Sequence, residues 1–106
     1  MTGPGDLDRR LTLEASEETT DDQGGLVRVF VPVTDLWAQV VPQRGRVNFA
    51  ADAPGAYVTH RIIVRDKFVI TLRHRLREDD TIYRIVSKRR IHDGRYLEID
   101  VEERVE

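Results

Sequence analysis

Alternation of apolar and polar side chains runs through most of this sequence and limits the folds open to it. Leu11 and Leu13 alternate with polar residues near the N-terminus, and Leu97, Ile99 and Val101 do so near the C-terminus. A period of two is that of a half-buried β-strand, whereas an amphipathic helix repeats every 3.6 residues. The chain contains no convincing helical pattern. The sequence therefore predicts an all-β protein.

About six segments carry this strand pattern. They cover residues 11–15, 27–40 with an interruption at Pro32, 58–65, 68–76, 81–90 and 95–101. Proline cannot donate to a sheet ladder, so Pro32 marks an edge position, a bulge or a strand break. The acidic stretch 17–25 is predicted to be a loop, 78–80 a turn, and Asp93-Gly94 a two-residue hairpin turn. Six short antiparallel strands predict a small β-barrel or sandwich.

The chain has 106 residues, which predicts a single domain over 1–106. Its core is expected to come from the apolar positions of the strands. These are Leu11, Leu13, Trp37, Val40, Ile62, Val64, Ile85, Leu97 and Ile99.

A long loop, residues 43–57, separates the strand that ends near Pro42 from the strand that starts near Tyr57. A connection of this length without regular structure is usually functional or disordered. Two interpretations stay open: Phe49 folds back and caps the domain, or the loop is an arm that docks onto another chain. Aromatic and arginine residues dominate many interfaces. The predicted contact residues are Arg44, Gly45, Arg46, Asn48, Phe49 and Tyr57.

Charge is unevenly spread along the chain, although the net charge is only −2. Five acids and no base occupy residues 14–22, whereas residues 61–95 hold eleven bases against five acids. Such segments could meet across neighbouring strands or across neighbouring subunits. The bases could instead form a solvated face or contact DNA phosphates. Candidates for subunit or DNA contact are Arg73, Arg75, Arg77, Lys88, Arg89 and Arg90.

No residue pattern of an enzyme or a cofactor site is found. There is no cysteine, and His60, His74 and His92 match no metal-ligand spacing. Neither serine lies in a glycine-flanked nucleophile turn, and no loop has phosphate-binding glycine spacing. The sequence predicts no catalytic residue, no cofactor and no metal. It also predicts no signal peptide and no membrane-spanning helix.

Several short motifs occur in a fixed order across nearly the whole chain. They are Gly5-x-Leu7-x-Arg9-Arg10-Leu11-Thr12-Leu13, Asp22-x-Gly24-Gly25, Trp37-Ala38-x-Val40-x-Pro42 with Gly45, Thr59-His60-Arg61 with Arg65, Arg73, and Tyr83-x-Ile85. In this order the chain resembles the phage head–tail joining family. That family comprises the adaptor, head-closure and stopper proteins of tailed phages, prophages and gene transfer agents. Two departures stand out, namely Glu78-Asp79-Asp80 in place of a glycine-bearing turn and an acidic C-terminal tail.

The resemblance implies a structural protein of the particle neck, made in the bacterial cytoplasm. Its implied partners are copies of itself in a cyclic ring, a portal or adaptor protein on the head side, and a tail terminator or tail protein on the other. Packaged double-stranded DNA would pass through the ring without being read for sequence, and no membrane would be involved. From the residues alone, a small β-barrel that binds nucleic acid is the alternative.

Overall fold

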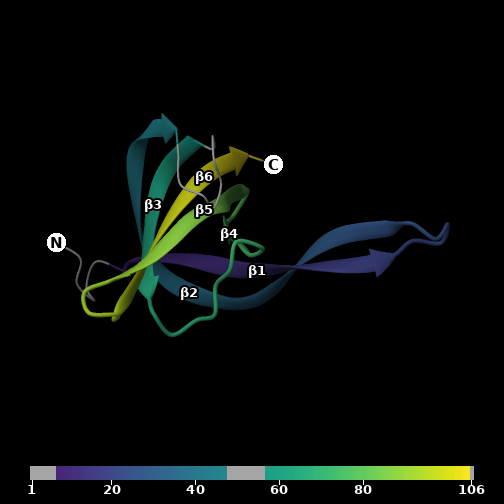
Figure 1. The fold of residues 1–106 in the computed structure, drawn as a ribbon, viewed down its shortest axis with the longest axis horizontal. Helices are drawn as coiled ribbons and strands as arrows, with labels where there is room; N and C mark the ends of the chain where they lie inside the picture. The colour runs from purple at the N-terminus through teal and green to yellow at the C-terminus, as the bar shows by residue number, and fades with distance from the viewer. Residues whose placement is uncertain (1–6, 48–56, 106) are drawn as a thin grey trace.

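Six antiparallel strands and no helix make up the residues that the computed structural model describes, 7–47 and 57–105 (Figure 1). The strands are β1 (Arg9–Thr20), β2 (Leu26–Val47), β3 (Tyr57–Arg65), β4 (Arg75–Glu78), β5 (Thr81–Ile91) and β6 (Tyr96–Val105). The all-β prediction is therefore confirmed. In these ranges, no helix is long and apolar enough to cross a membrane.

The strands pair in the order β1-β2-β3-β6-β5-β4, and β4 returns to β1 to close a barrel. Closure depends on a short ladder of three residue pairs, Thr12 with Arg77, Leu13 with Leu76 and Glu14 with Arg75. Inside the barrel lies one apolar cluster. Its members are Leu11, Leu13, Leu36, Ala38, Ile62, Val64, Ile70, Leu76, Tyr83, Ile85, Leu97, Ile99 and Val101, with Val40 and Phe68 packed against them.

Trp37 was predicted to be a core residue, and this prediction is wrong. Its side chain is 56% exposed, whereas its neighbours Leu36 and Ala38 are buried. Successive side chains of a strand point to opposite faces, so a strand that turns Leu36 and Ala38 inward must turn Trp37 outward. Trp37 lies opposite Arg10 of β1 on the outside of the barrel.

The stretch 17–25 was expected to be an acidic loop and is mostly strand. β1 continues to Thr20 and pairs with β2 up to the pair Thr20 and Leu26, so that only residues 21–25 turn. Nor does Pro32 end a strand. It sits beside a bulge, because Leu13 pairs with Thr34 while Glu14 pairs with Pro32 and leaves Val33 as the extra residue.

Two further local predictions were wrong. Residues 68–74 are loop rather than strand, and β4 begins only at Arg75. The loop is held by Thr71, which receives a backbone hydrogen bond from His74 and donates its own N–H to the His74 ring at 3.0 Å. The hairpin turn between β5 and β6 spans four residues, 92–95, instead of two, with positive φ at His92, Asp93 and Gly94.

A pair of substitutions tests this assignment of the core. Leu11→Ala should lower the free energy of unfolding by about 2–5 kcal/mol because it leaves a cavity in the barrel. Trp37→Ala should lower it by less than about 1 kcal/mol because the indole is half in solvent. Chemical denaturation of both variants measures the difference. Equal losses would mean that Trp37 packs as deeply as Leu11.

Candidate interaction surface

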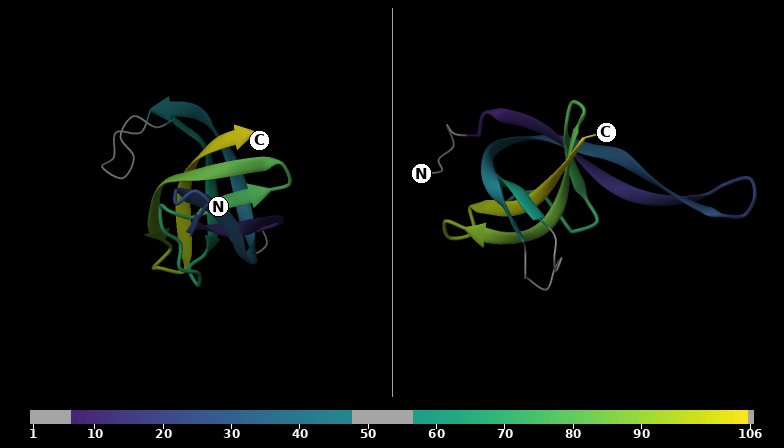
Figure 2. Two further views of the ribbon diagram at one scale, coloured as in Figure 1. Left: turned by 90° about the vertical axis from the view of Figure 1, so that its right-hand side faces the viewer. Right: turned by 90° about the horizontal axis from the view of Figure 1, so that it is seen from above.

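The largest feature outside the barrel is a two-stranded arm, defined as residues 15–31, formed by the outer halves of β1 and β2 (Figure 1). It projects from one side of the barrel, and the described molecule measures 51 × 29 × 25 Å (Figure 2). In the arm, β1 pairs only with β2, so each strand has one edge without a neighbouring strand among the described residues. Free edges and exposed apolar side chains are typical of a surface that binds another chain.

Apolar side chains of the arm are exposed along β2. Leu26 is 70% exposed, and Val27 and Val29 are also largely open to solvent. On β1 they face Thr20, Thr19 and Glu17. The arm therefore combines an apolar strand with an acidic one.

A turn built around Asp21 ends the arm. One carboxylate oxygen of Asp21 accepts hydrogen bonds from the backbone N–H groups of Gln23 (2.9 Å) and Gly25 (2.7 Å). Gly24 has a φ of 82°, which favours glycine. At Gly25 a Cβ atom would stand 2.8 Å from the Asp21 carboxylate. These residues give the arm a fixed tip instead of a flexible loop.

At the base of the arm, a buried carboxylate meets an arginine from the closing strand. Glu14 is 6% exposed and accepts a hydrogen bond of 2.6 Å from Arg75 Nε, while Arg77 Nη1 lies 3.6 Å from its other oxygen. The Arg75 guanidinium also covers the Phe30 ring at 3.9 Å. One side chain therefore ties β1, β2 and β4 together where the arm leaves the barrel.

Beside this contact lies a hollow of about 430 Å³, called the basic hollow below. It lies between the arm, the loop before β4, and the outer face of β5 and β6. Five of its ten lining residues are arginines, and they surround apolar side chains. The lining is Arg28, Phe30, Leu72, Arg73, His74, Arg75, Ile82, Arg84, Ile85 and Arg104.

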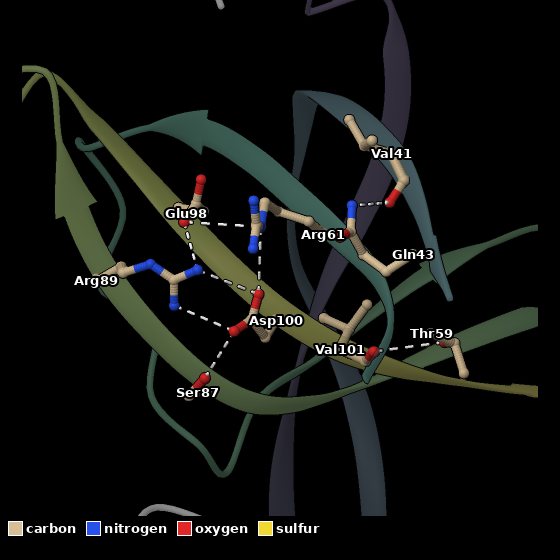
Figure 3. A network of polar contacts seen from close by, with 9 residues as sticks. All are labelled: Val41, Gln43, Thr59, Arg61, Ser87, Arg89, Glu98, Asp100 and Val101. Carbon is tan, nitrogen blue, oxygen red and sulfur yellow. Dashed lines mark hydrogen bonds and ion pairs between the residues drawn. The ribbon is translucent and has the colours of Figure 1, made fainter. Parts of the chain in front are cut away.

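A second group of charges, across β3, β6 and β5, is fully matched (Figure 3). Glu98 and Asp100 lie between Arg61 and Arg89, with Arg61 Nε 3.5 Å from Asp100 and Arg89 Nη1 3.1 Å from it. Ser87 also donates to Asp100 at 3.2 Å. Arg89 is thus engaged by its own chain.

The start of β1 is held to the end of β4 by Arg9 and Glu78. Arg9 Nε donates to the Glu78 carboxylate at 2.7 Å, and a second contact joins Arg9 Nη2 to the other oxygen. This charge-assisted hydrogen bond lowers the pKa of Glu78 below its ordinary value of 4.5. Nearby, burial raises the pKa of the Tyr83 phenol.

The predicted basic residues do not form one common face. Arg75 and Arg77 contact Glu14, Arg89 joins the matched group, and Arg90 contacts Asp66 at 2.8 Å. Arg73 lines the basic hollow and Lys88 a different depression. Of the predicted loop contacts, Tyr57 begins β3 and is exposed. The predicted loop 43–57 was wrong at its start, because β2 runs to Val47 and so contains Arg44, Gly45 and Arg46. Asn48 and Phe49 lie outside the described residues.

The described residues contain no group of three or more potential metal ligands. His60 stacks edge-on against Tyr83 and His92 against Tyr96, at 5.4 and 5.8 Å between ring centroids. His74 holds the loop before β4.

The arm was missed by the sequence analysis, although a signal for it exists. Val27, Val29 and Val31 recur at every second position, with Arg28 and Phe30 between them, and this stretch faces residues 15–20 across the turn. The two runs are equally long and flank a turn rich in Asp and Gly. Acidic composition, taken as a sign of a loop, hid this hairpin.

Comparison with known proteins gives one family and four matching chains of solved structures. The sequence model described as "Phage head completion protein" matches residues 3–104. A chain of the virion of a native gene transfer agent particle is 27% identical, with a TM-score of 0.67 over 94% of this chain and 97% of that one.

The second structural relative is protein SF1141 from Shigella flexneri 2a, whose solution structure has a TM-score of 0.73 at 22% identity. The alignment covers 96% of both chains, and at this identity it shows a shared fold. No curated protein matched the sequence.

The buried carboxylate gives the first prediction for this surface. Glu14→Gln should lower the free energy of unfolding by about 3 kcal/mol because it leaves the Arg75 charge without a counter-charge. Asp35→Asn is the matched control. Its carboxylate pairs with Arg10 at 3.1 Å in an exposed position and should matter by less than about 1 kcal/mol. Equal effects would show that burial adds nothing to the Glu14 contact.

The Arg9–Glu78 contact gives a pH prediction. A carboxyl group whose pKa is lowered by folding stabilises the fold above its ordinary pKa, and this stabilisation is lost as the pH falls through the lowered pKa. The unfolding free energies of wild type and Glu78→Gln should therefore differ most at neutral pH and converge below about pH 4.5. Glu103→Gln, an exposed change, should show no such convergence. Urea denaturation across pH 3–7 compares all three proteins, and a constant gap would refute the assignment.

Proposed function

Because the chain belongs to the phage head completion protein family, we propose that it is a structural connector of a phage-like particle. In this proposal, copies form a ring between the portal or adaptor of the DNA-filled head and the tail, extend or close the DNA exit channel, and offer the surface on which the tail docks. The family is a structural one and not a known enzyme family. The family match over residues 3–104 carries the proposal.

The arm supports assembly into a ring. A cyclic ring needs a heterologous interface in which one surface of a subunit meets a different surface of the next. A barrel with a projecting arm on one side provides two unlike surfaces. The core of an interface is rich in apolar side chains. The arm supplies such side chains, because Leu26, Val27 and Val29 are exposed in the single chain.

Residues 43–57 are proposed to contact neighbouring subunits or the partner ring. The proposal rests on their sequence, which combines Phe49 with Arg44 and Arg46 near the end of β2. Tyr57, at the start of β3, is exposed. The portal or adaptor, and the tail terminator or tail protein, are the partners proposed for these surfaces.

A stand-alone nucleic-acid module receives less support. Such a module needs free cations along a strand or groove. Of the basic residues first considered for DNA contact, Arg75, Arg77, Arg89 and Arg90 are engaged with carboxylates of their own chain. We propose instead that DNA passes the ring with weak phosphate contacts that carry no sequence information.

Shortening the arm tests the connector function. A variant in which residues 17–29 are replaced by a tight Asn-Gly turn should keep the barrel folded, because the arm contributes little to the apolar cluster. It should fail to join tails to DNA-filled heads. Electron microscopy of particles counts joined tails, and circular dichroism checks the fold.

A double variant, Arg46→Ala with Phe49→Ala, tests the segment 43–57 in the same assay. Loss of tails in both variants would support two separate contacts. Normal tail joining by a particle that lacks this chain altogether would refute the connector function. Normal joining by the shortened arm alone would remove only the arm from the proposal.

A further inference from the structure

Charges without an ion-pair partner stand at the tip of the arm and in the basic hollow, as they also do at several positions on the barrel. Among the described side chains, Glu17, Glu18 and Asp22 near the tip have no ion-pair partner, and neither do Arg28 and Arg73 in the basic hollow. Glu18 and Arg28 are cross-strand partners, yet no ion pair joins them. The arm thus ends in unmatched acids, and Arg73 stands unmatched in the hollow at its base.

The basic hollow keeps its excess of positive charge after its internal contacts are counted. Glu14 engages Arg75, and Glu102 engages both Arg84 (3.2 Å) and Arg104 (3.1 Å). Two carboxylates therefore face five arginines. Phe30 and Leu72 add apolar area, so the hollow suits a protein segment that offers carboxylates together with some apolar contact.

Asp22 at the tip and Arg73 in the hollow of one chain cannot meet. Glu14, paired with Arg75 at the hollow, lies eight residues before Asp22 on a continuous hairpin. At about 3.3 Å a residue, the ladder holds them about 25 Å apart. A contact between them requires two molecules.

We propose that the acidic arm tip of one copy binds the basic hollow of the next copy, with Asp22 facing Arg73. The inference deepens the proposed function and rests on it, because it names the contact that would repeat around the ring. Each subunit gives a tip on one side and receives a tip on the other, which is the unlike pair of surfaces that a closed ring needs. Burial of Leu26 beside the charges adds apolar contact.

Thiol crosslinking in assembled particles tests this contact, and the absence of native cysteine makes it specific. The chain carries Asp22→Cys together with Arg73→Cys and is treated with a short thiol-specific crosslinker, because a salt-bridged pair stands farther apart than a disulfide spans. A ladder of covalent multimers is expected under denaturing conditions. Arg95 lies in the β5–β6 turn at the end of the molecule opposite the arm (Figure 1). The matched control Asp22→Cys with Arg95→Cys should give no ladder.

Charge reversal then tests the chemistry. With the crosslinking pair moved to Glu18→Cys and Leu72→Cys, Arg73→Glu should reduce the ladder about tenfold, since like charges that face each other oppose association. Adding Asp22→Arg to Arg73→Glu should restore it. A ladder that is insensitive to both changes would overturn the charge pairing.

The remaining outcomes separate this inference from the proposed function. A chain present in tailed particles without any ladder, or with the same ladder in the control, overturns the tip-to-hollow contact alone. If Arg73→Glu leaves the ladder intact but weakens DNA retention, the hollow is a DNA surface, and the tip-to-hollow contact is overturned. A ladder from purified protein that never enters particles supports the contact and refutes the connector function.

Discussion

The contact of Glu14 with Arg75 is the constraint on which the remaining architecture depends. It is the last pair of the three that close the barrel, and it lies next to the bulge at Val33. From Thr12 to Glu14, β1 has a neighbouring strand on both sides. Beyond it, β1 has only β2, and the hairpin becomes an arm. The stacking of Arg75 on Phe30 fixes the direction in which that arm leaves.

An ion pair at this position specifies register more than it adds stability. Desolvation of Glu14 and Arg75 offsets much of their attraction, as is usual for buried pairs. A slip of one residue in the short ladder, however, would turn Leu76 out of the core and a charge into it. With only three residue pairs to close the barrel, this penalty against wrong pairing matters. The Arg9–Glu78 contact secures the same two strands from the other end.

Sequence alternation predicted the fold class because every strand buries one face, and Leu11, Ile62 and Ile99 are buried accordingly. The alternation also predicts that Trp37 points outward, because its neighbours Leu36 and Ala38 point inward. The prediction of a buried Trp37 gave more weight to its hydrophobicity than to its position in the alternation. The arm could not be predicted from burial, because both its faces are exposed. Glu17 and Glu18 lie in a strand, held there by pairing with β2 rather than by a core. Nor can the sequence alone show which charges meet, since Arg61 and Arg89 find Glu98 and Asp100 only when β3, β6 and β5 become neighbours.

Ion pairs between distant segments help to hold the barrel, as in the group that Arg61 and Arg89 form with Glu98 and Asp100. On the arm, the paired strands hold Asp22 about 25 Å from Glu14 and from the basic hollow beside it. Asp22 therefore cannot reach Arg73 of its own chain. A charged tip whose partner lies on another molecule favours association of the subunits.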